Sequence, residues 1–163
     1  MRQVQHFING QHVAGTGARK GDIYNPNTGQ VQAQVDFADD AILQQAIDAA
    51  AAGDVIQVND GSYVISTTID VNKGLSIDGN GSTLDVSGQG VGISIASDVD
   101  GVSISNFAIV GDAGTYSGIT VNPGASNVSI LNNDISGMSL SNPGNSSPLS
   151  YRILSWGNAA PTN

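Results

Sequence analysis

One short pattern occurs four times between Gly53 and Gly137: VIQV at residues 55–58, LSID at 75–78, VSIS at 102–105 and VSIL at 128–131. Each copy alternates apolar and polar residues, and a corner rich in Gly or Asn separates it from a second short alternation. The steps between copies are 19, 27 and 26 residues when the equivalent positions are Ile56, Leu75, Val102 and Val128. A repeat of this length is typical of a solenoid, in which each coil packs only against its neighbours.

The apolar residues of the repeats predict three inward rows that stack from coil to coil. The first row contains Leu75 with Ile77, Val102 with Ile104 and Val128 with Ile130; the second contains Val64 or Ile65, Leu84 with Val86, Ile109 and Ile135; the third contains Ile69 with Val71, Ile93 with Ile95 and Ile119 with Val121. Three strands of roughly 5 residues per coil, plus corners, account for the step. At the corner after the first strand, Asn80, Asn106 and Asn132 predict a stacked Asn ladder that satisfies backbone groups.

The one helix that the sequence predicts covers residues 39–52. Asp39 is its expected N-cap, Asp40 favours the first turn, and Gly53 ends it. Its apolar stripe consists of Ile42, Leu43, Ala46, Ile47 and Ala50. We expect this helix to cap the first coil, because an uncovered sheet edge invites another strand.

Residues 1–38 are expected to form a small β unit ahead of the helix. FINGQHV at 7–13 places Asn9 and Gly10 between two β-prone segments, which is the strongest local signal of a hairpin. A second turn, NPNTG at 25–29, precedes an alternation of Val31, Ala33 and Val35.

Residues 5–38, with these two turn segments, resemble the extreme N-terminus of aldehyde dehydrogenases, most closely the methylmalonate-semialdehyde dehydrogenase branch. The resemblance implies a β-hairpin edge element without dehydrogenase activity. The family's nucleophilic cysteine has no counterpart, since the chain has no Cys, and no Gly-x-Gly-x-x-Gly loop opens a helix.

About residues 40–138 resemble right-handed parallel β-helix proteins of the pectate-lyase-like superfamily. The resemblance rests on GDVIQVNDGSY at 53–63, LSIDGNG at 75–81 and NVSILNN at 127–133. It implies a short β-helix of about four coils, and it favours an extracellular or cell-surface location, although the N-terminus shows no export signal. Because the superfamily includes pectate-lyase-like enzymes, phage tailspikes and surface proteins, the resemblance implies a fold rather than one activity.

The expected fold class is therefore all-β, with four parts along the chain. They are an aldehyde-dehydrogenase-like β unit at 1–38, a capping helix at 39–52, a parallel β-helix at 53–138, and a loop, last strand and tail at 139–163. The last apolar segment, YRILSW at 151–156, either folds over the end of the stack or leaves an edge for a partner chain.

Composition excludes several classes of partner and site. The net charge is −9, all 14 acidic residues are Asp, and no Lys or Arg occurs between Lys73 and Arg152. Nucleic acid and anionic membrane surfaces are therefore not expected partners, because phosphate requires clustered cations. The absence of Cys excludes disulfides and thiolate metal sites, and no segment is long and apolar enough to cross a membrane.

Catalysis by the chain is not expected, and no catalytic residue or dinucleotide cofactor is assigned. Glycoside hydrolysis needs two carboxylates at one bond, and a polysaccharide lyase needs a base with calcium or arginine. Only Asp78 is acidic among the outward positions of the first strands, which are Gln57, Ser76, Asp78, Ser103, Ser105, Ser129 and Leu131.

Three groups of residues are candidates for binding. Asp98 and Asp100 could contribute oxygen ligands to calcium, although Asp is also a common corner residue. Asp78 and three aromatic residues, Tyr116, Tyr151 and Trp156, are candidates for binding a ligand such as a sugar, although packing beneath a loop explains the aromatic residues equally well. His6 and His12 flank the hairpin without an evident third metal ligand.

The leading hypothesis for function is a non-catalytic structural or assembly protein that forms homo-oligomers, or binds a partner, through the N-terminal unit or an open C-terminal edge. The first alternative is a carbohydrate-binding module of an extracellular β-helix protein, with polysaccharide as its partner. The second is a truncated or degenerate polysaccharide lyase or hydrolase. Concentration-dependent mass would indicate assembly, whereas a polysaccharide that raises the melting temperature would indicate binding.

Overall fold

A computed structural model describes residues 1–15, 19–138 and 151–155 of the chain, with side chains through Met138. The chain divides into two compact units, Met1–Ala49 and Ala50–Asn163.

The described residues of the first unit form five short strands: β1 (Arg2–Val4), β2 (His6–Ile8), β3 (Gln11–Val13), β4 (Lys20–Tyr24) and β5 (Val31–Asp36). β2 and β3 form the predicted hairpin, with Asn9 and Gly10 in its turn at φ angles of 48° and 76°. β4 and β5 pair in the antiparallel direction around the second predicted turn, and β1 adds a parallel strand to β5. The parallel pairing of β1 was not evident from the sequence, because it depends on contacts far apart in the chain.

The carboxylate of Asp36 connects three segments of the first unit. Its Oδ1 lies 3.1 Å from Nζ of Lys20 and accepts a hydrogen bond of 3.0 Å from Nε2 of Gln3, while Oδ2 accepts one of 3.3 Å from the backbone N–H of Gly15. These bonds, that from Lys20 foremost, lower the pKa of Asp36 below its ordinary value. The side chain is 5% exposed, so its charge is retained inside the unit by these partners.

The helix α1 (Asp40–Ala49) begins as predicted and ends earlier than predicted. Oδ1 of Asp39 accepts the backbone N–H of Ile42 at 3.0 Å, which is the expected N-cap bond. Past Ala49, the N–H of Ala51 bonds instead to the carboxylate of Asp54 at 2.8 Å, so the predicted extension to residue 52 is wrong. Within the described ranges no helix is long and apolar enough to cross a membrane. A capping role for α1 stays a prediction.

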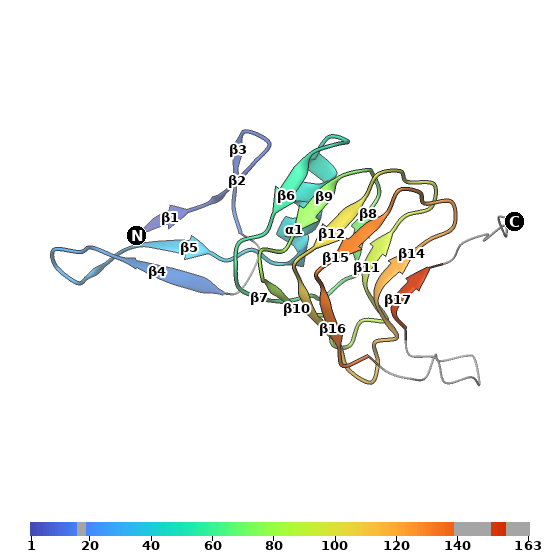
Figure 1. Cartoon of the computed structure of the whole chain (residues 1–163). Helices are drawn as coiled ribbons and strands as arrows, with labels where there is room; N and C mark the ends of the chain where they lie inside the picture. Colours follow the sequence, from blue (N-terminus) through green and yellow to red (C-terminus); the bar gives the residue numbers. More distant parts are fainter. Residues whose placement is uncertain (16–18, 139–150, 156–163) are drawn as a thin grey trace, which may run out of the picture. The chain divides into compact units, whose positions relative to one another are not determined.

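In the part of the second unit that the structure describes, twelve short strands form three parallel sheets, whose arrangement can be followed in Figure 1. The strands are β6 (Val55–Gln57), β7 (Ser62–Val64), β8 (Ile69–Val71), β9 (Ser76–Asp78), β10 (Thr83–Asp85), β11 (Val91–Ile95), β12 (Ser103–Ser105), β13 (Ala108–Val110), β14 (Ser117–Val121), β15 (Ser129–Leu131), β16 (Asp134–Ser136) and β17 (Tyr151–Ser155).

Successive strands join the three sheets in rotation. The first sheet has the order β15-β12-β9-β6, the second β16-β13-β10-β7, and the third β17-β14-β11-β8. Each sheet therefore contains four strands among the described residues, in agreement with the four copies of the sequence pattern. β17 is the strand predicted within residues 151–156, and it pairs in parallel with β14. The chain is mainly β, with parallel sheets.

The strand register confirms most of the predicted apolar rows. Ile77 pairs with Ile104 and Ile104 with Ile130, and the third row of Ile69, Ile93 and Ile119 is buried. The predicted equivalence of Ile56 with Leu75 is wrong: Ile56 pairs with Ile77, so the first step is 21 residues, from position 56 to position 77.

The second row also differs from the prediction at the first coil. Tyr63 is the residue aligned with Leu84, Ile109 and Ile135, and Val64 points outward with 66% of its surface exposed. Of the two predicted alternatives, Val64 and Ile65, Ile65 is the buried residue. Its backbone N–H donates a hydrogen bond to the carbonyl oxygen of Asp85, the residue before Val86.

The corners between the first and second sheets differ in length. Residues 58–61 and 79–82 form four-residue corners in the first two coils, whereas residues 106–107 and 132–133 form two-residue corners in the next two. Asn80, Asn106 and Asn132 all have positive φ angles, of 50°, 60° and 55°. Asn tolerates this left-handed conformation better than most residues, which explains its recurrence at these corners.

The predicted Asn ladder takes another form. The side chain of Asn133 accepts the backbone N–H of Phe107 at 3.0 Å and donates to the carbonyl of Ile104 at 2.9 Å. Asn133 is thus the corner residue whose amide satisfies backbone groups, while the side chain of Asn106 donates to the carboxylate of Asp78.

The ring of Phe107 is 2% exposed and packs against Gly79 of the preceding coil. A Cβ atom at Gly79 would lie 2.5 Å from Cδ1 of Phe107 and 2.7 Å from the carbonyl oxygen of Asn106. Gly79 is therefore required here because two coils approach each other closely, and any side chain would displace the buried ring.

We predict that Gly79→Ala lowers the free energy of unfolding by about 1–3 kcal/mol, because the added methyl group overpacks the corner. Urea unfolding followed by circular dichroism measures the change. Gly61→Ala is the matched control, since a Cβ there would meet its nearest atom at 3.4 Å in the equivalent corner of the first coil. Equal stability of the two variants would contradict this packing.

Candidate functional site

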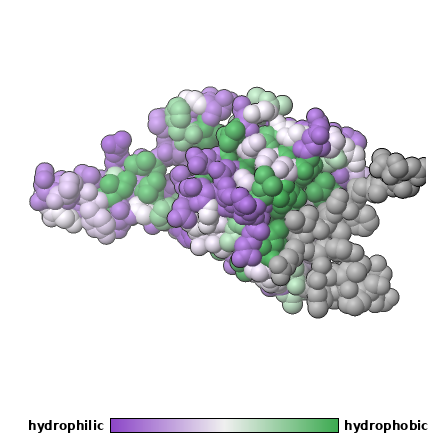
Figure 2. Space-filling view, in the orientation of Figure 1, coloured by the Kyte–Doolittle hydropathy of each residue, from purple (hydrophilic) through white to green (hydrophobic). Residues whose placement is uncertain are grey.

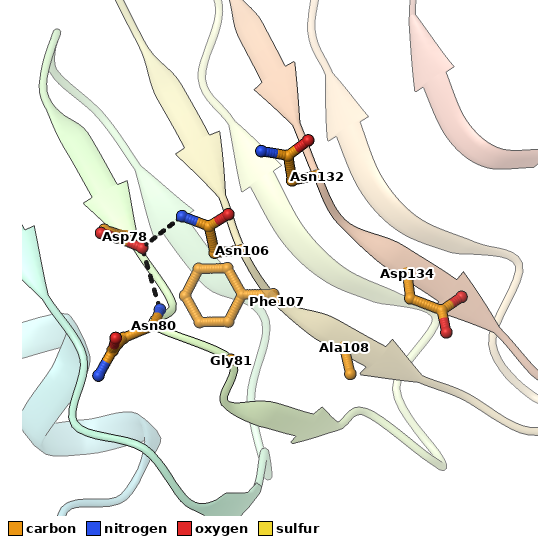
Figure 3. A pocket seen from close by; sticks show the side chains of 8 residues that line it. All are labelled: Asp78, Asn80, Gly81, Asn106, Phe107, Ala108, Asn132 and Asp134. Atoms are coloured by element: carbon orange, nitrogen blue, oxygen red, sulfur yellow. Dashed lines mark hydrogen bonds between the residues drawn. The ribbon is translucent and has the colours of Figure 1, made fainter.

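A hollow of the second unit lies at the corners between the first and second sheets (Figure 3). It is open to solvent and has a volume of about 430 Å³. The residues that line it are Asp78, Asn80, Gly81, Asn106, Phe107, Ala108, Asn132 and Asp134. Hydrophilic residues gather over these corners on the molecular surface (Figure 2).

Three successive coils contribute to the hollow at equivalent places. Asp78 ends β9, Asn106 follows β12, and Asn132 follows β15, while Asp134 begins β16. The register of the first sheet aligns Asp78 with Ser105 and Ser105 with Leu131, so the three corners lie one above another. The polar row is thus a direct consequence of the parallel pairing.

The carboxylate of Asp78 is fixed by its neighbours. Its Oδ1 accepts a hydrogen bond of 2.8 Å from Nδ2 of Asn106 and one of 3.0 Å from the backbone N–H of Asn80 (Figure 3). These two bonds, that from Asn106 first, lower the pKa of Asp78 below its ordinary value. Asp78 is therefore ionised at neutral pH and acts as a hydrogen-bond acceptor.

The wall and rim of the hollow have different exposure. Phe107 lines the hollow but is nearly buried. Its backbone N–H donates a hydrogen bond to the side-chain oxygen of Asn133. Asn80, Asn132 and Asp134 are exposed at the rim. The hollow therefore presents carboxylates, which accept hydrogen bonds, and primary amides, which donate and accept them.

The resolved pKa shifts of carboxyl groups in the second unit are all downward. A general acid that acts near neutral pH needs a carboxyl group with a raised pKa. The shift at Asp78 is in the opposite direction, and the resolved shifts at Asp85, Asp100 and Asp112 are also downward. In each case hydrogen bonds to the ionised carboxylate are the leading cause.

Among the aromatic candidates from the sequence, Tyr116 is the one whose side chain the structure describes, and it does not line this hollow. Tyr116 lies in the loop between β13 and β14, where its ring covers Gly90: a Cβ at Gly90 would lie 2.8 Å from Cε1 of Tyr116. Tyr116 thus packs against Gly90, and its predicted role in binding a ligand stays a prediction. The side chain of Tyr151 and the whole of Trp156 lie outside the described part of the chain, so their predicted role in binding stays a prediction.

Asp100, one of the two candidate calcium ligands, already connects two coils. Its Oδ1 accepts hydrogen bonds of 2.6 Å from Oγ of Ser126 and 2.7 Å from Nδ2 of Asn127, and these bonds lower the pKa of Asp100. Asp98 adopts a positive φ of 58°, as is common for Asp in a corner. Calcium binding by Asp98 and Asp100 stays a prediction.

The two histidines of the hairpin lie on opposite faces. His6 pairs with Val13, and His12 pairs with Phe7. Directly paired residues share a face, and successive residues alternate between faces, so the two imidazoles point in opposite directions. In the ranges that the structure describes, no three His, Asp, Glu or Cys side chains are grouped to hold a metal ion.

The sequence pattern indicated Asp78 as a candidate for ligand binding and gave no such indication for the other residues of the hollow. Asn106 and Asn132 were assigned only to the corners, and Phe107 and Asp134 were not singled out. The recurrence of Asn at 80, 106 and 132 was the available signal. It indicated three stacked corners, but the corner lengths that shape the hollow follow only from the strand boundaries.

Comparison with known proteins gives one partial match. Malonate-semialdehyde dehydrogenase of Pseudomonas aeruginosa is 48% identical to this chain over 52 residues, which are 32% of this chain and 10% of that protein. The match confirms the expected resemblance to an aldehyde dehydrogenase over part of the chain. This chain spans about a tenth of the length of that relative. No family model and no solved structure matches significantly.

We predict that Asn106→Gly raises the pKa of Asp78 toward its ordinary value, because it removes the amide that stabilises the carboxylate while a glycine still accepts the positive φ. The folded-state pKa of Asp78 is depressed, so the bond stabilises the fold above the unfolded pKa and this contribution is lost as the pH falls through the folded pKa. An NMR titration of the Asp78 carboxyl carbon measures the shift.

Asn132→Gly is the control for that titration. It changes the equivalent corner one coil further on, where the residue has nearly the same φ. An unchanged Asp78 pKa in Asn106→Gly, or an equal shift in Asn132→Gly, would contradict the assigned hydrogen bond.

Proposed function

We propose that the second unit is a right-handed parallel β-helix of about four coils, related in architecture to pectate-lyase-like proteins. The rotation of successive strands through three parallel sheets supports this proposal. The pairing of equivalent Ile residues from coil to coil also supports it. Such a stack presents the same corner of each coil along one side of the molecule.

We further propose that this β-helix is a non-catalytic carbohydrate-binding module. The observation on which the proposal rests is the hollow of about 430 Å³ at the stacked corners, lined by carboxylates and primary amides. This volume falls in the range of known small-molecule sites, about 300–1,000 Å³. Carboxylates and amides together match a hydroxyl-rich ligand, because each sugar hydroxyl both donates and accepts hydrogen bonds.

Assembly remains a second candidate function, and one observation favours it. β15 and β16 are the last strands of their sheets among the described residues. Leu131, which points outward from β15, has 55% of its surface exposed. Exposed strand edges with apolar neighbours favour the addition of another chain.

The carbohydrate proposal predicts that a neutral polysaccharide raises the melting temperature. The first ligands to test are xylan, glucomannan and cello-oligosaccharides. Differential scanning fluorimetry measures the melting temperature with each of them. A ligand at about 100 times its dissociation constant adds about 2.7 kcal/mol to the stability of the fold. Asp78→Asn should weaken the effect, because it replaces an acceptor oxygen by a donor group.

Asp85→Asn is the matched control for Asp78→Asn. Asp85 also ends a strand and accepts the backbone N–H of the residue two positions later, but it does not line the hollow. Equal loss of ligand response in both variants would contradict binding at the hollow.

The assembly candidate predicts a molar mass that increases with concentration in light scattering over a hundredfold range. Leu131→Lys on the edge strand should abolish the increase, because a charge on an edge opposes strand addition. Val110→Lys on the inner strand β13 is the control, since Val110 is also exposed and points outward. A constant monomer mass of the unmodified chain would exclude this candidate.

A further inference from the structure

We infer that the hollow takes an uncharged, extended sugar chain that lies across the strands and contacts three coils at once. This inference rests on the proposed carbohydrate binding and adds the charge class, the direction and the minimum length of the ligand. It follows from the order in which the coils supply the lining residues and from the charges around them.

The direction of the ligand follows from the positions of the polar groups. Asp78 and Asn80 come from the second coil, Asn106 from the third, and Asn132 with Asp134 from the fourth. Neighbouring strands of a sheet lie about 4.7–4.9 Å apart, so the row extends over roughly 10 Å along the stack. One sugar ring is shorter than this row, whereas a chain of two or three rings can contact all three coils.

The charge class follows from the electrostatics of the row. Asp78 is held in its ionised form by Asn106 and Asn80, and the carboxylate of Asp134 is exposed on the same hollow. No Lys or Arg occurs in the sequence between Lys73 and Arg152 that could offset these charges. A uronic acid, sulfate or phosphate group in the hollow would therefore meet two like charges, and the described residues that line it contain no Lys or Arg.

The hydrogen-bond inventory also favours neutral hydroxyl groups. Both bonds to Asp78 from described residues end on Oδ1, so Oδ2 is the oxygen that can accept a ligand hydroxyl. The amides of Asn80 and Asn132, exposed at the rim, can donate to and accept from the same chain. The carboxylates of the hollow can only accept hydrogen bonds, which suits a ligand rich in hydroxyl groups and free of anionic groups.

The test measures how the affinity of the whole 163-residue protein chain for oligosaccharides depends on their length and charge. Cello- and manno-oligosaccharides of one to six units are titrated by calorimetry beside oligogalacturonates of the same lengths. We expect affinity to increase up to about three units and then to level off, because the row spans about 10 Å. Oligogalacturonates should bind at least about tenfold more weakly in low salt, with the difference reduced in high salt.

Two variants assign the charge effect to the row. Asp78→Asn with Asp134→Asn should reduce the discrimination against oligogalacturonate by about tenfold, whereas Asp85→Asn with Asp70→Asn, two carboxylates outside the lining, should preserve it. Near-native circular dichroism of both double variants separates a binding effect from unfolding.

The outcomes distinguish the inference from the function on which it rests. If oligogalacturonates bind as tightly as neutral chains, or if one sugar unit binds as tightly as three, the inference is wrong while carbohydrate binding stands. If neither series binds and the amide NMR signals of residues 78–81, 106–108 and 132–134 do not shift, carbohydrate binding itself is wrong.

Discussion

The in-register pairing of parallel strands is the constraint on which the second unit depends. Ile56, Ile77, Ile104 and Ile130 follow one another along the first sheet, so each coil places its inward side chain on that of the coil before. A shift of one residue would turn every apolar side chain outward, which makes this register strongly specified. Each polar corner begins where a paired strand ends, so the corners of successive coils are aligned as the strands are.

The hollow arises where this regular stack changes its corner length. A four-residue corner follows β9, and two-residue corners follow β12 and β15. The ring of Phe107 packs against Gly79, and the amide of Asn133 fixes the backbone behind the ring. Asn106 then meets the carboxylate of Asp78 across the coils. The polar surface of the hollow is therefore supported by a buried ring and by backbone hydrogen bonds, and a ligand would not have to order it.

The sequence was informative wherever a local pattern determines the structure. The Asn9-Gly10 turn, the Asp39 N-cap and the rows of Ile and Val were predicted, because each follows from turn chemistry, capping or alternation. The predicted equivalence of Ile56 with Leu75 was wrong, because Ile56 pairs with Ile77. The first coil is shorter than the others, and the apolar pattern alone does not show its register. The hollow could not be predicted from the sequence, because its shape depends on which coil has the longer corner and on the contact of Phe107 with Gly79.

Amide hydrogen exchange at the corners is the most direct test of a preformed hollow. The backbone N–H groups of Gly79, Gly81 and Phe107 donate to Ser105, Asn106 and the Asn133 side chain at 2.8, 2.8 and 3.0 Å. If these bonds hold the corners, the three amides should exchange as slowly as the amide of Ile104 within β12, through the same cooperative opening. Fast exchange at the corners beside a protected β12 would show that the hollow is not a fixed site.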